Sequence, residues 1–203
     1  MMRWKSLGLA VAVILSICLP GCSPAAPEPE AADEKLADSL TEVFQVGLDT
    51  MNPSPVEREA IERAITTGQI DSADYEAAHL RYIQCLIKHD IQPTFRKTPE
   101  GLYVELPYFS PNGVADSTEA NLKCSADNLI IGILYRIQQS NPDLLADNRL
   151  LAVRCLQKRG FVDADYTVDD FERNWTARVF PFVPSADGPS DCLYVAGYAY
   201  LSN

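Results

Sequence analysis

The chain has 203 residues and a formal net charge of −11, with 47% hydrophobic and 22% charged residues. Its length allows one domain or two small ones, and its apolar content excludes a wholly disordered protein. Without the first 21 residues, which carry Arg3 and Lys5 and no acid, the formal charge is −13. A body this acidic repels nucleic acid and anionic lipid headgroups, so we expect neither as a direct ligand.

Residues 1–22 fall into three successive segments of different composition. A short basic segment, residues 1–6, precedes an apolar run of 13 residues at 7–19. This run is too short for a bilayer-spanning helix, which takes about 20 residues, and it is typical of a secretory signal. The sequence L-P-G-C then ends at Cys22 and resembles a lipobox. We therefore interpret residues 1–21 as a bacterial lipoprotein signal peptide. The alternatives are a plain signal peptide cleaved elsewhere and a signal anchor.

The lipobox resemblance implies that Cys22 is the lipid attachment site. It implies a thioether-linked diacylglycerol on Cys22, cleavage before this residue, and a new N-terminus that is usually acylated as well, with palmitate or a similar chain. Pro20 departs from the small or β-branched residue usual at that position. Residues 22–32 then form a tether whose three prolines favour an extended chain of roughly 30 Å. We therefore expect attachment to the cell membrane through the lipid, on its outer, extracytoplasmic face.

Residues 33–203 are predicted to form a single extracytoplasmic domain, mainly α-helical. Apolar spacing and capping residues predict helices over 33–51, 55–67, 116–139 and 148–158, with others that begin after Asp71 and Thr167. Residues 93–106 break the helical period around Thr98-Pro99-Glu100-Gly101, which suits a type I turn and predicts a β-hairpin. Residues 180–189 are predicted to be an irregular loop, and the tail from Ser190 is compatible with helix or strand. The fold class is a disulfide-stapled helical bundle with one small hairpin, or α+β if the hairpin is counted.

Four cysteines remain after Cys18 leaves with the signal and Cys22 takes the lipid. They are Cys85, Cys124, Cys155 and Cys192. An even number outside the cytoplasm predicts disulfides. Cys85, Cys155 and Cys192 are each followed by Leu and, after three further residues, by a residue that ends a helix, whereas Cys124 is not. If the cysteines pair in chain order, the two partners are separated by 39 residues in the first pair and by 37 in the second. We therefore favour Cys85 with Cys124 and Cys155 with Cys192. The alternatives are Cys85–Cys155 with Cys124–Cys192, and four thiols on zinc, which the lack of a C-x2-C pair disfavours.

Residues 65–78 read I-T-T-G-Q-I-D-S-A-D-Y-E-A-A, and residues 84–90 read Q-C-L-I-K-H-D. Together they resemble a pattern in many small actinobacterial lipoproteins. That pattern combines a lipobox, a G-x-[IV]-[TSD]-x-x-[ED]-Y-E-x-A turn and helix start, and one or more C-L-x3-G units, here also at Cys155 to Gly160. Asp90 replaces the usual glycine of such a unit. The resemblance implies an envelope location and disulfides. It carries over no catalytic residue.

No motif of the sequence predicts catalysis or a cofactor. Cys85 and His89 are spaced as i, i+4, a possible metal pair, but we expect a disulfide at Cys85 and a favourable helix-dipole position for His89. The acidic run from Asp163 to Glu172 lacks the glycine and glutamate of a calcium-binding EF-hand loop, so we interpret it as a capped helix start. We therefore assign no catalytic residue, no metal ligand and no cofactor.

Aromatic residues near the predicted loops are candidates for a ligand platform. They are Tyr103, Tyr108, Phe109 and Trp175. Such residues can bind a sugar or a peptide, although in a small protein they more often complete the core. We expect a non-catalytic binding or interaction module for an envelope protein or a wall ligand. The alternative is a small envelope hydrolase, which would need His79 or His89 in a pocket with a serine or carboxylate in reach.

Overall fold

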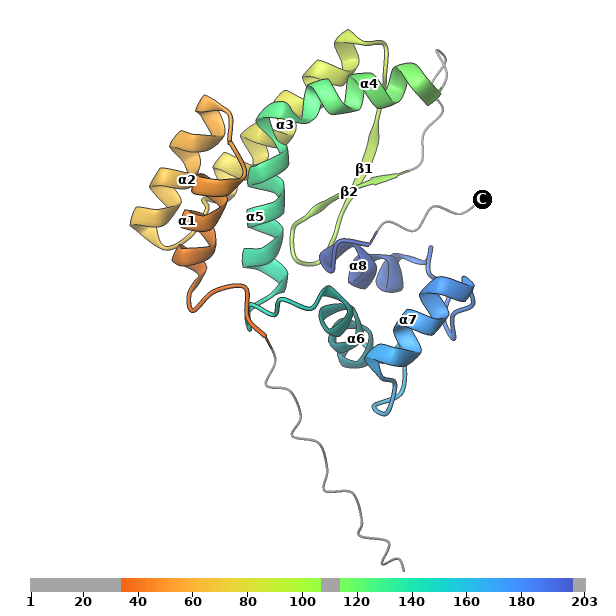
Figure 1. Ribbon diagram of the computed structural model, residues 1–203. Helices are drawn as coiled ribbons and strands as arrows, with labels where there is room; N and C mark the ends of the chain where they lie inside the picture. The colour runs from red at the N-terminus through yellow and green to blue at the C-terminus, as the bar shows by residue number, and fades with distance from the viewer. Residues whose placement is uncertain (1–33, 107–113, 199–203) are drawn as a thin grey trace, which may run out of the picture. The chain divides into compact units, whose positions relative to one another are not determined.

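The computed structural model describes residues 34–106 and 114–198. This part of the chain contains eight α-helices and one antiparallel β-hairpin, which confirms the predicted fold class (Figure 1). In chain order the elements are α1 (Leu40–Thr50), α2 (Pro55–Thr67), α3 (Ser72–Lys88), β1 (Thr94–Lys97), β2 (Tyr103–Leu106), α4 (Val114–Cys124), α5 (Leu129–Ser140), α6 (Asn148–Lys158), α7 (Val168–Ala177) and α8 (Asp187–Val195).

Capping residues set several helix boundaries where the sequence predicts them. Ser54 and Glu57 form the predicted capping box at the start of α2, in which each side chain accepts a hydrogen bond from the other residue's backbone N–H. α2 ends at Gly68, whose φ of 82° is a left-handed conformation that glycine adopts without strain. The side chains of Asp71 and Thr167 cap α3 and α7.

The first helix is shorter than predicted. The apolar spacing predicts a helix over 33–51, but α1 begins at Leu40, because the side chain of Ser39 accepts a hydrogen bond from the N–H three residues later. The residues before it pair with the segment that precedes α6: the N–H of Leu36 donates to the carbonyl of Leu144 at 2.7 Å. Backbone pairing with a distant segment replaces the first turns of the predicted helix.

The single helix predicted over 116–139 is wrong, because the structure has two helices there. α4 ends at Cys124, which is in a disulfide, and a 3₁₀ turn follows at Ser125–Asp127. α5 then begins with a cap supplied from α2, since the carboxylate of Glu57 accepts a hydrogen bond from the N–H of Ile130 at 2.8 Å. Glu57 is 1% exposed, so a buried carboxylate from a distant element stabilises this helix start.

The C-terminal segment, which the sequence leaves undecided, is a helix. α8 begins at Asp187, inside the loop predicted over 180–189. Pro189 lies in the first turn, where a missing N–H costs no helical hydrogen bond. A Cβ at Gly188 would collide with the ring of Phe161, so the close approach of these two segments requires glycine.

Two disulfides join the helices. They link Cys85 to Cys124 and Cys155 to Cys192, which confirms the sequential pairing. The first connects α3 with α4 and the second connects α6 with α8. In the chain-entropy model, cross-links that close loops of this length each contribute up to about 4 kcal/mol to stability.

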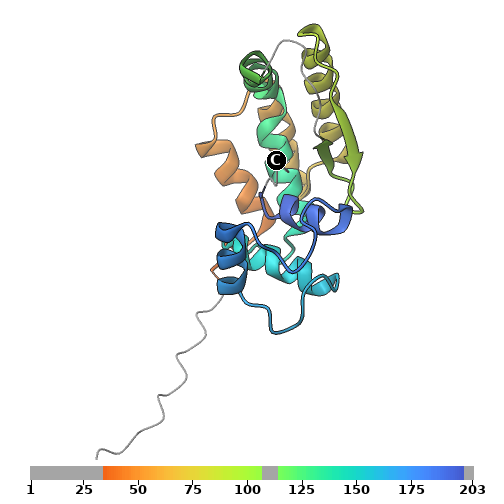
Figure 2. The same cartoon turned by 90° about the vertical axis from the view of Figure 1, so that its right-hand side faces the viewer.

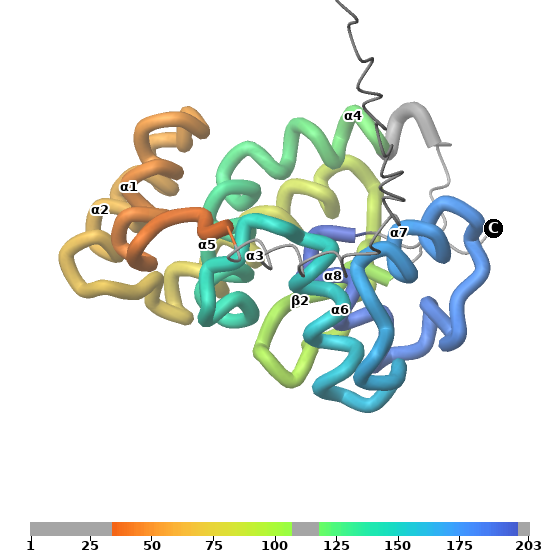
Figure 3. The backbone as a smooth tube through the Cα atoms, turned by 60° about the horizontal axis from the view of Figure 1, so that its bottom comes forward, coloured from red at the N-terminus to blue at the C-terminus, as the bar shows by residue number. Residues whose placement is uncertain are grey.

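Buried apolar residues form two main clusters. The first contains Phe44 of α1 and Ile131 of α5, together with residues of α2 and α3. The second contains Leu156 of α6 and Phe171 of α7, together with residues of α8. Cys155 packs against both clusters. Within the described residues, α1 and α2 lie together, α6 to α8 lie together, and α5 lies between the two groups (Figures 1 and 3).

The β-hairpin is held from both faces. Its register pairs Lys97 with Tyr103 and Arg96 with Val104. Because side chains alternate along a strand, Lys97 and Tyr103 share the face toward α3, beside which the strands run (Figure 2). From the other face, Arg96 donates a hydrogen bond to Asp191 of α8, which is 3% exposed. The hairpin is therefore fixed between α3 and the C-terminal helices.

Candidate functional site

A groove of about 500 Å³ lies between α3 and the β-hairpin. We call it the α3–hairpin groove. Its lining residues come from one side of α3 and from the hairpin face that meets it: Glu76, Ala77, His79, Leu80, Ile83, Phe95 and Tyr103. A groove of this volume is within the range that accommodates a ligand or a few side chains of a partner.

His79 is packed into a stack of rings at this groove. Its imidazole stacks on the ring of Tyr103, with centroids 3.7 Å apart, and it meets the ring of Phe95 edge-on at 4.4 Å. His79 is 6% exposed, and none of the described residues forms a hydrogen bond with its Nε2. Burial lowers the pKa of His79 to about 4, although the carboxylate of Glu76 opposes the shift and Lys97 adds to it. The imidazole is therefore neutral near pH 7 and a weak base.

The polar groups at the groove are paired with one another. The carboxylate of Glu76 accepts hydrogen bonds from the hydroxyl of Tyr103 and from the ammonium group of Lys97, both at 2.5 Å. Burial opposes the charge on Glu76, but these bonds lower its pKa overall, and the bond to Glu76 raises the pKa of Lys97. The ammonium group of Lys97 also lies over the Tyr103 ring, 4.7 Å from its centroid. His79 is stacked on the same ring, so the ring of Tyr103 is already engaged by two neighbouring side chains.

The open rim of the groove is aliphatic. Leu80 is 54% exposed, and Ile83 lies half-buried one turn further along α3. Ile87, at 53% exposed, continues the same side of the helix beyond the groove. Exposed aliphatic side chains at i, i+3 and i+7 form a stripe along α3, a pattern that a partner segment can cover.

The structure does not bring the predicted aromatic platform together among the described residues. Tyr103 lies in the α3–hairpin groove, whereas Trp175 of α7 packs on the second core cluster, with its ring 4.7 Å from that of Tyr198. Tyr108 and Phe109 lie outside the described residues. The groove was not predicted, although the spacing of Leu80, Ile83 and Ile87 indicates a second apolar stripe on α3.

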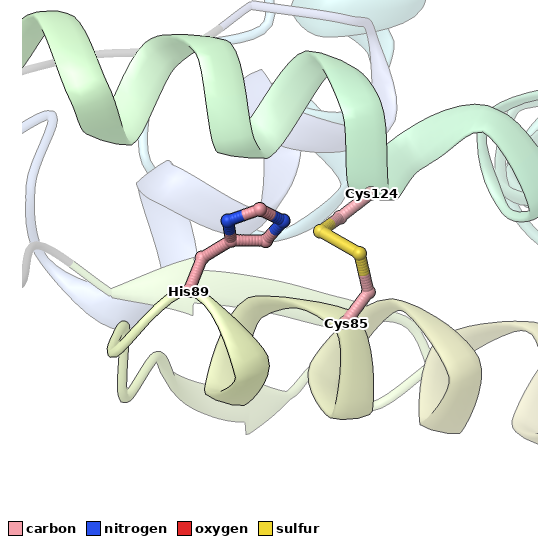
Figure 4. Close-up of side chains that lie close together, drawn as sticks. All are labelled: Cys85, His89 and Cys124. Carbon is pink, nitrogen blue, oxygen red and sulfur yellow. A yellow bond between two sulfur atoms is a disulfide. The ribbon is translucent and has the colours of Figure 1, made fainter.

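The remaining candidates for chemistry are accounted for by local structure. His89 lies beside the Cys85–Cys124 disulfide (Figure 4) and is not among the residues that line the groove. The acidic run is a capped helix start, as predicted: Asp170 and Thr167 form a capping box at the start of α7. The carboxylate of Glu76, whose charge acts on His79, is already bound to Tyr103 and Lys97.

Comparison with protein-family models, with curated proteins and with solved structures finds no match to this chain. Among the helices of the described residues, none combines the length and the hydropathy that crossing a membrane requires.

The buried imidazole predicts a pH-dependent stability. The unfolded chain protonates His79 near its ordinary pKa of 6.5, whereas the folded protein resists protonation until about pH 4. The free energy of unfolding should therefore fall as the pH falls from 6.5 to 4, by up to about 3 kcal/mol from this residue, at about 1.4 kcal/mol per pKa unit. Denaturant unfolding at pH 7 and pH 4 measures this loss.

The comparison variants are His79→Gln, which should lack this component, and His89→Gln, which should retain it. An unchanged pH dependence in His79→Gln would show that His79 titrates as an exposed histidine does.

Proposed function

We propose that this chain is a lipid-anchored protein of the outer face of the cell membrane, and that its folded body is a non-catalytic binding module. The ordered signal segment and the L-P-G-C sequence at Cys22 support the anchor. The two disulfides are consistent with an oxidising compartment outside the cytoplasm.

The recognition surface in this proposal is the α3–hairpin groove. The main support for this proposal is the exposed aliphatic side chain of Leu80 at the rim of the groove. Among the polar residues that line the groove, Glu76 is hydrogen-bonded to Tyr103 and Lys97, and His79 is buried. A surface of this kind binds through apolar contact and supplies no free acid, base or nucleophile. This favours a binding module over the alternative, a small envelope hydrolase, because His79 is buried and a weak base, and no serine or carboxylate of the described residues accepts or donates a hydrogen bond at its Nε2.

The ligand in this proposal is an apolar segment of another envelope protein. Sugars bind to exposed ring faces, and the Tyr103 ring is covered by His79 and Lys97. Aliphatic side chains at helical spacing instead match the apolar face of a partner helix. The acidic body also favours a partner segment with basic residues around that face, because charge complementarity steers association.

The anchor predicts a specific modification of the mature protein. Mass analysis of the N-terminal peptide, taken from purified membranes, should show Cys22 as the first residue and carrying a diacylglycerol. Changing Cys22 to Ser should leave the protein uncleaved or release it from the membrane fraction. An unmodified secreted chain that begins at another residue would refute the anchor.

The groove predicts site-specific contact with a protein in intact cells. A photo-crosslinking amino acid at Leu80 should give one discrete protein adduct, and Ile83→Glu in the same chain should abolish it by placing a charge in the groove. The matched control is the same amino acid at Val46 of α1, which is 49% exposed and does not line the groove. The proposed site would be contradicted by equal yields of adduct from positions 80 and 46, or by an adduct at position 80 that persists in Ile83→Glu. An adduct of wall polymer in place of protein would also contradict it.

A further inference from the structure

The side chains of Cys85, Cys124 and His89 converge near the C-terminal ends of α3 and α4 (Figure 4). The two Sγ atoms and an imidazole nitrogen all lie within 4.8 Å of one another. Cys124 is 5% exposed, while Cys85 and His89 are half-buried, so the cluster lies at the edge of the folded body. Two sulfurs and an imidazole at one point are a donor set typical of zinc sites.

We propose that this cluster is a redox-controlled metal site: oxidised it is a structural disulfide, and reduced it binds Zn²⁺ through Cys85, Cys124 and His89. In the disulfide the sulfurs are bonded to each other and are not thiolate ligands. A dithiol reductant supplies two electrons and two protons, which break the S–S bond and leave two thiols, while the dithiol becomes its own disulfide. Zn²⁺ then replaces the two thiol protons, which go to solvent.

The spacing suits the metal after a small adjustment. Zn–S bonds of about 2.3 Å and Zn–N bonds of about 2.0 Å, in a tetrahedral arrangement, place the ligand atoms about 3.5–4 Å apart. In the reduced protein the two sulfurs are no longer bonded and can separate to this spacing, and the imidazole nitrogen already lies within 4.8 Å of them. Three protein ligands leave the fourth position for water or another small ligand.

The helix ends favour a cation over a reactive thiolate. Cys85 lies in the last turn of α3, and Cys124 is the last residue of α4, so the negative ends of two helix dipoles meet at the sulfurs. Catalytic thiols are instead activated at helix N-termini, where the dipole stabilises the thiolate. A divalent cation compensates both helix ends and both thiolates. The positive side chains of Lys88 and Lys123, also in these last turns, are exposed and turned to solvent.

The second disulfide provides an internal control. Within the described ranges, the Cys85 cluster is the group in which three possible ligand atoms meet, and Cys155–Cys192 belongs to no such group. Any general affinity of reduced cysteines for zinc should therefore appear at both pairs, whereas the proposed site should appear only at the first.

Thiol alkylation of the whole protein, purified in detergent, tests the site. The protein is first reduced by a phosphine in the absence of oxygen and is then given one equivalent of Zn²⁺ or Mg²⁺. Iodoacetamide is added next, and peptide mass mapping measures how fast each cysteine is alkylated. With Zn²⁺, alkylation of Cys85 and Cys124 should slow at least tenfold while Cys155 and Cys192 are unaffected, and Mg²⁺ should protect none. In His89→Gln, the Zn²⁺ concentration needed for protection should rise at least tenfold. The proposal is overturned if Zn²⁺ protects all four cysteines or none of them. It is also overturned if protection in His89→Gln needs no more Zn²⁺ than in the wild-type protein.

Thermal unfolding distinguishes a folded site from capture by the unfolded chain. In Cys155→Ser/Cys192→Ser, reduced as above, Zn²⁺ should raise the Tm, because it binds the folded state. In the matched variant Cys85→Ser/Cys124→Ser it should not. A lowered Tm in the first variant, or an equal rise in both, contradicts the site. If reduction unfolds the first variant, added Zn²⁺ should restore its cooperative unfolding transition but not that of the matched variant, and failure to restore it contradicts the site.

Discussion

The carboxylate of Glu57 caps two helices at once, and the arrangement of the other helices depends on it. One oxygen accepts the N–H of Ser54 at the start of α2, and the other accepts the N–H groups of Ile130 and Ile131 at the start of α5. The first N–H groups of a helix have no partner within it, and a negative charge there also offsets the positive end of the helix dipole. Since Asn128 makes no side-chain cap, the start of α5 relies on Glu57.

A second buried carboxylate fixes the other side of the structure. Asp191 of α8 accepts hydrogen bonds from Arg96 of β1 and from Arg159 at the end of α6. The hairpin is thereby held against the C-terminal helices, while its opposite face rests on α3. The α3–hairpin groove exists because both of its walls are fixed in this way. These two carboxylates serve the scaffold, and the surface left between α3 and the hairpin is mainly apolar.

Features governed by neighbouring residues were predictable from the sequence. The capping box of Ser54 depends on a residue only three positions away, so its pattern is visible in the chain. The disulfide pairing followed from the repeated Cys-Leu units and the similar loop lengths. α8 was not predicted, because Pro189 and Gly188 read as loop residues, although the first turn of a helix tolerates both.

Features set by distant partners were not predictable. The break between α4 and α5 depends on Glu57, which is 73 residues away from the amide of Ile130. The apolar period continues across the break, so it gave no sign of two helices. The groove was missed for a related reason: His79, Phe95 and Tyr103 come from three elements, and only tertiary packing stacks their rings.

Amide hydrogen exchange at Ile130 and Ile131 tests the central role of Glu57 most directly. These are first-turn amides of α5, which in an uncapped helix exchange quickly. Because both donate to a buried carboxylate, we expect them to be protected about as strongly as the amide of Leu134 in the same helix, and to lose this protection first in Glu57→Ala. Exchange in the wild-type protein as fast as that of Val56, an exposed first-turn residue of α2, would show that Glu57 does not join the two helices.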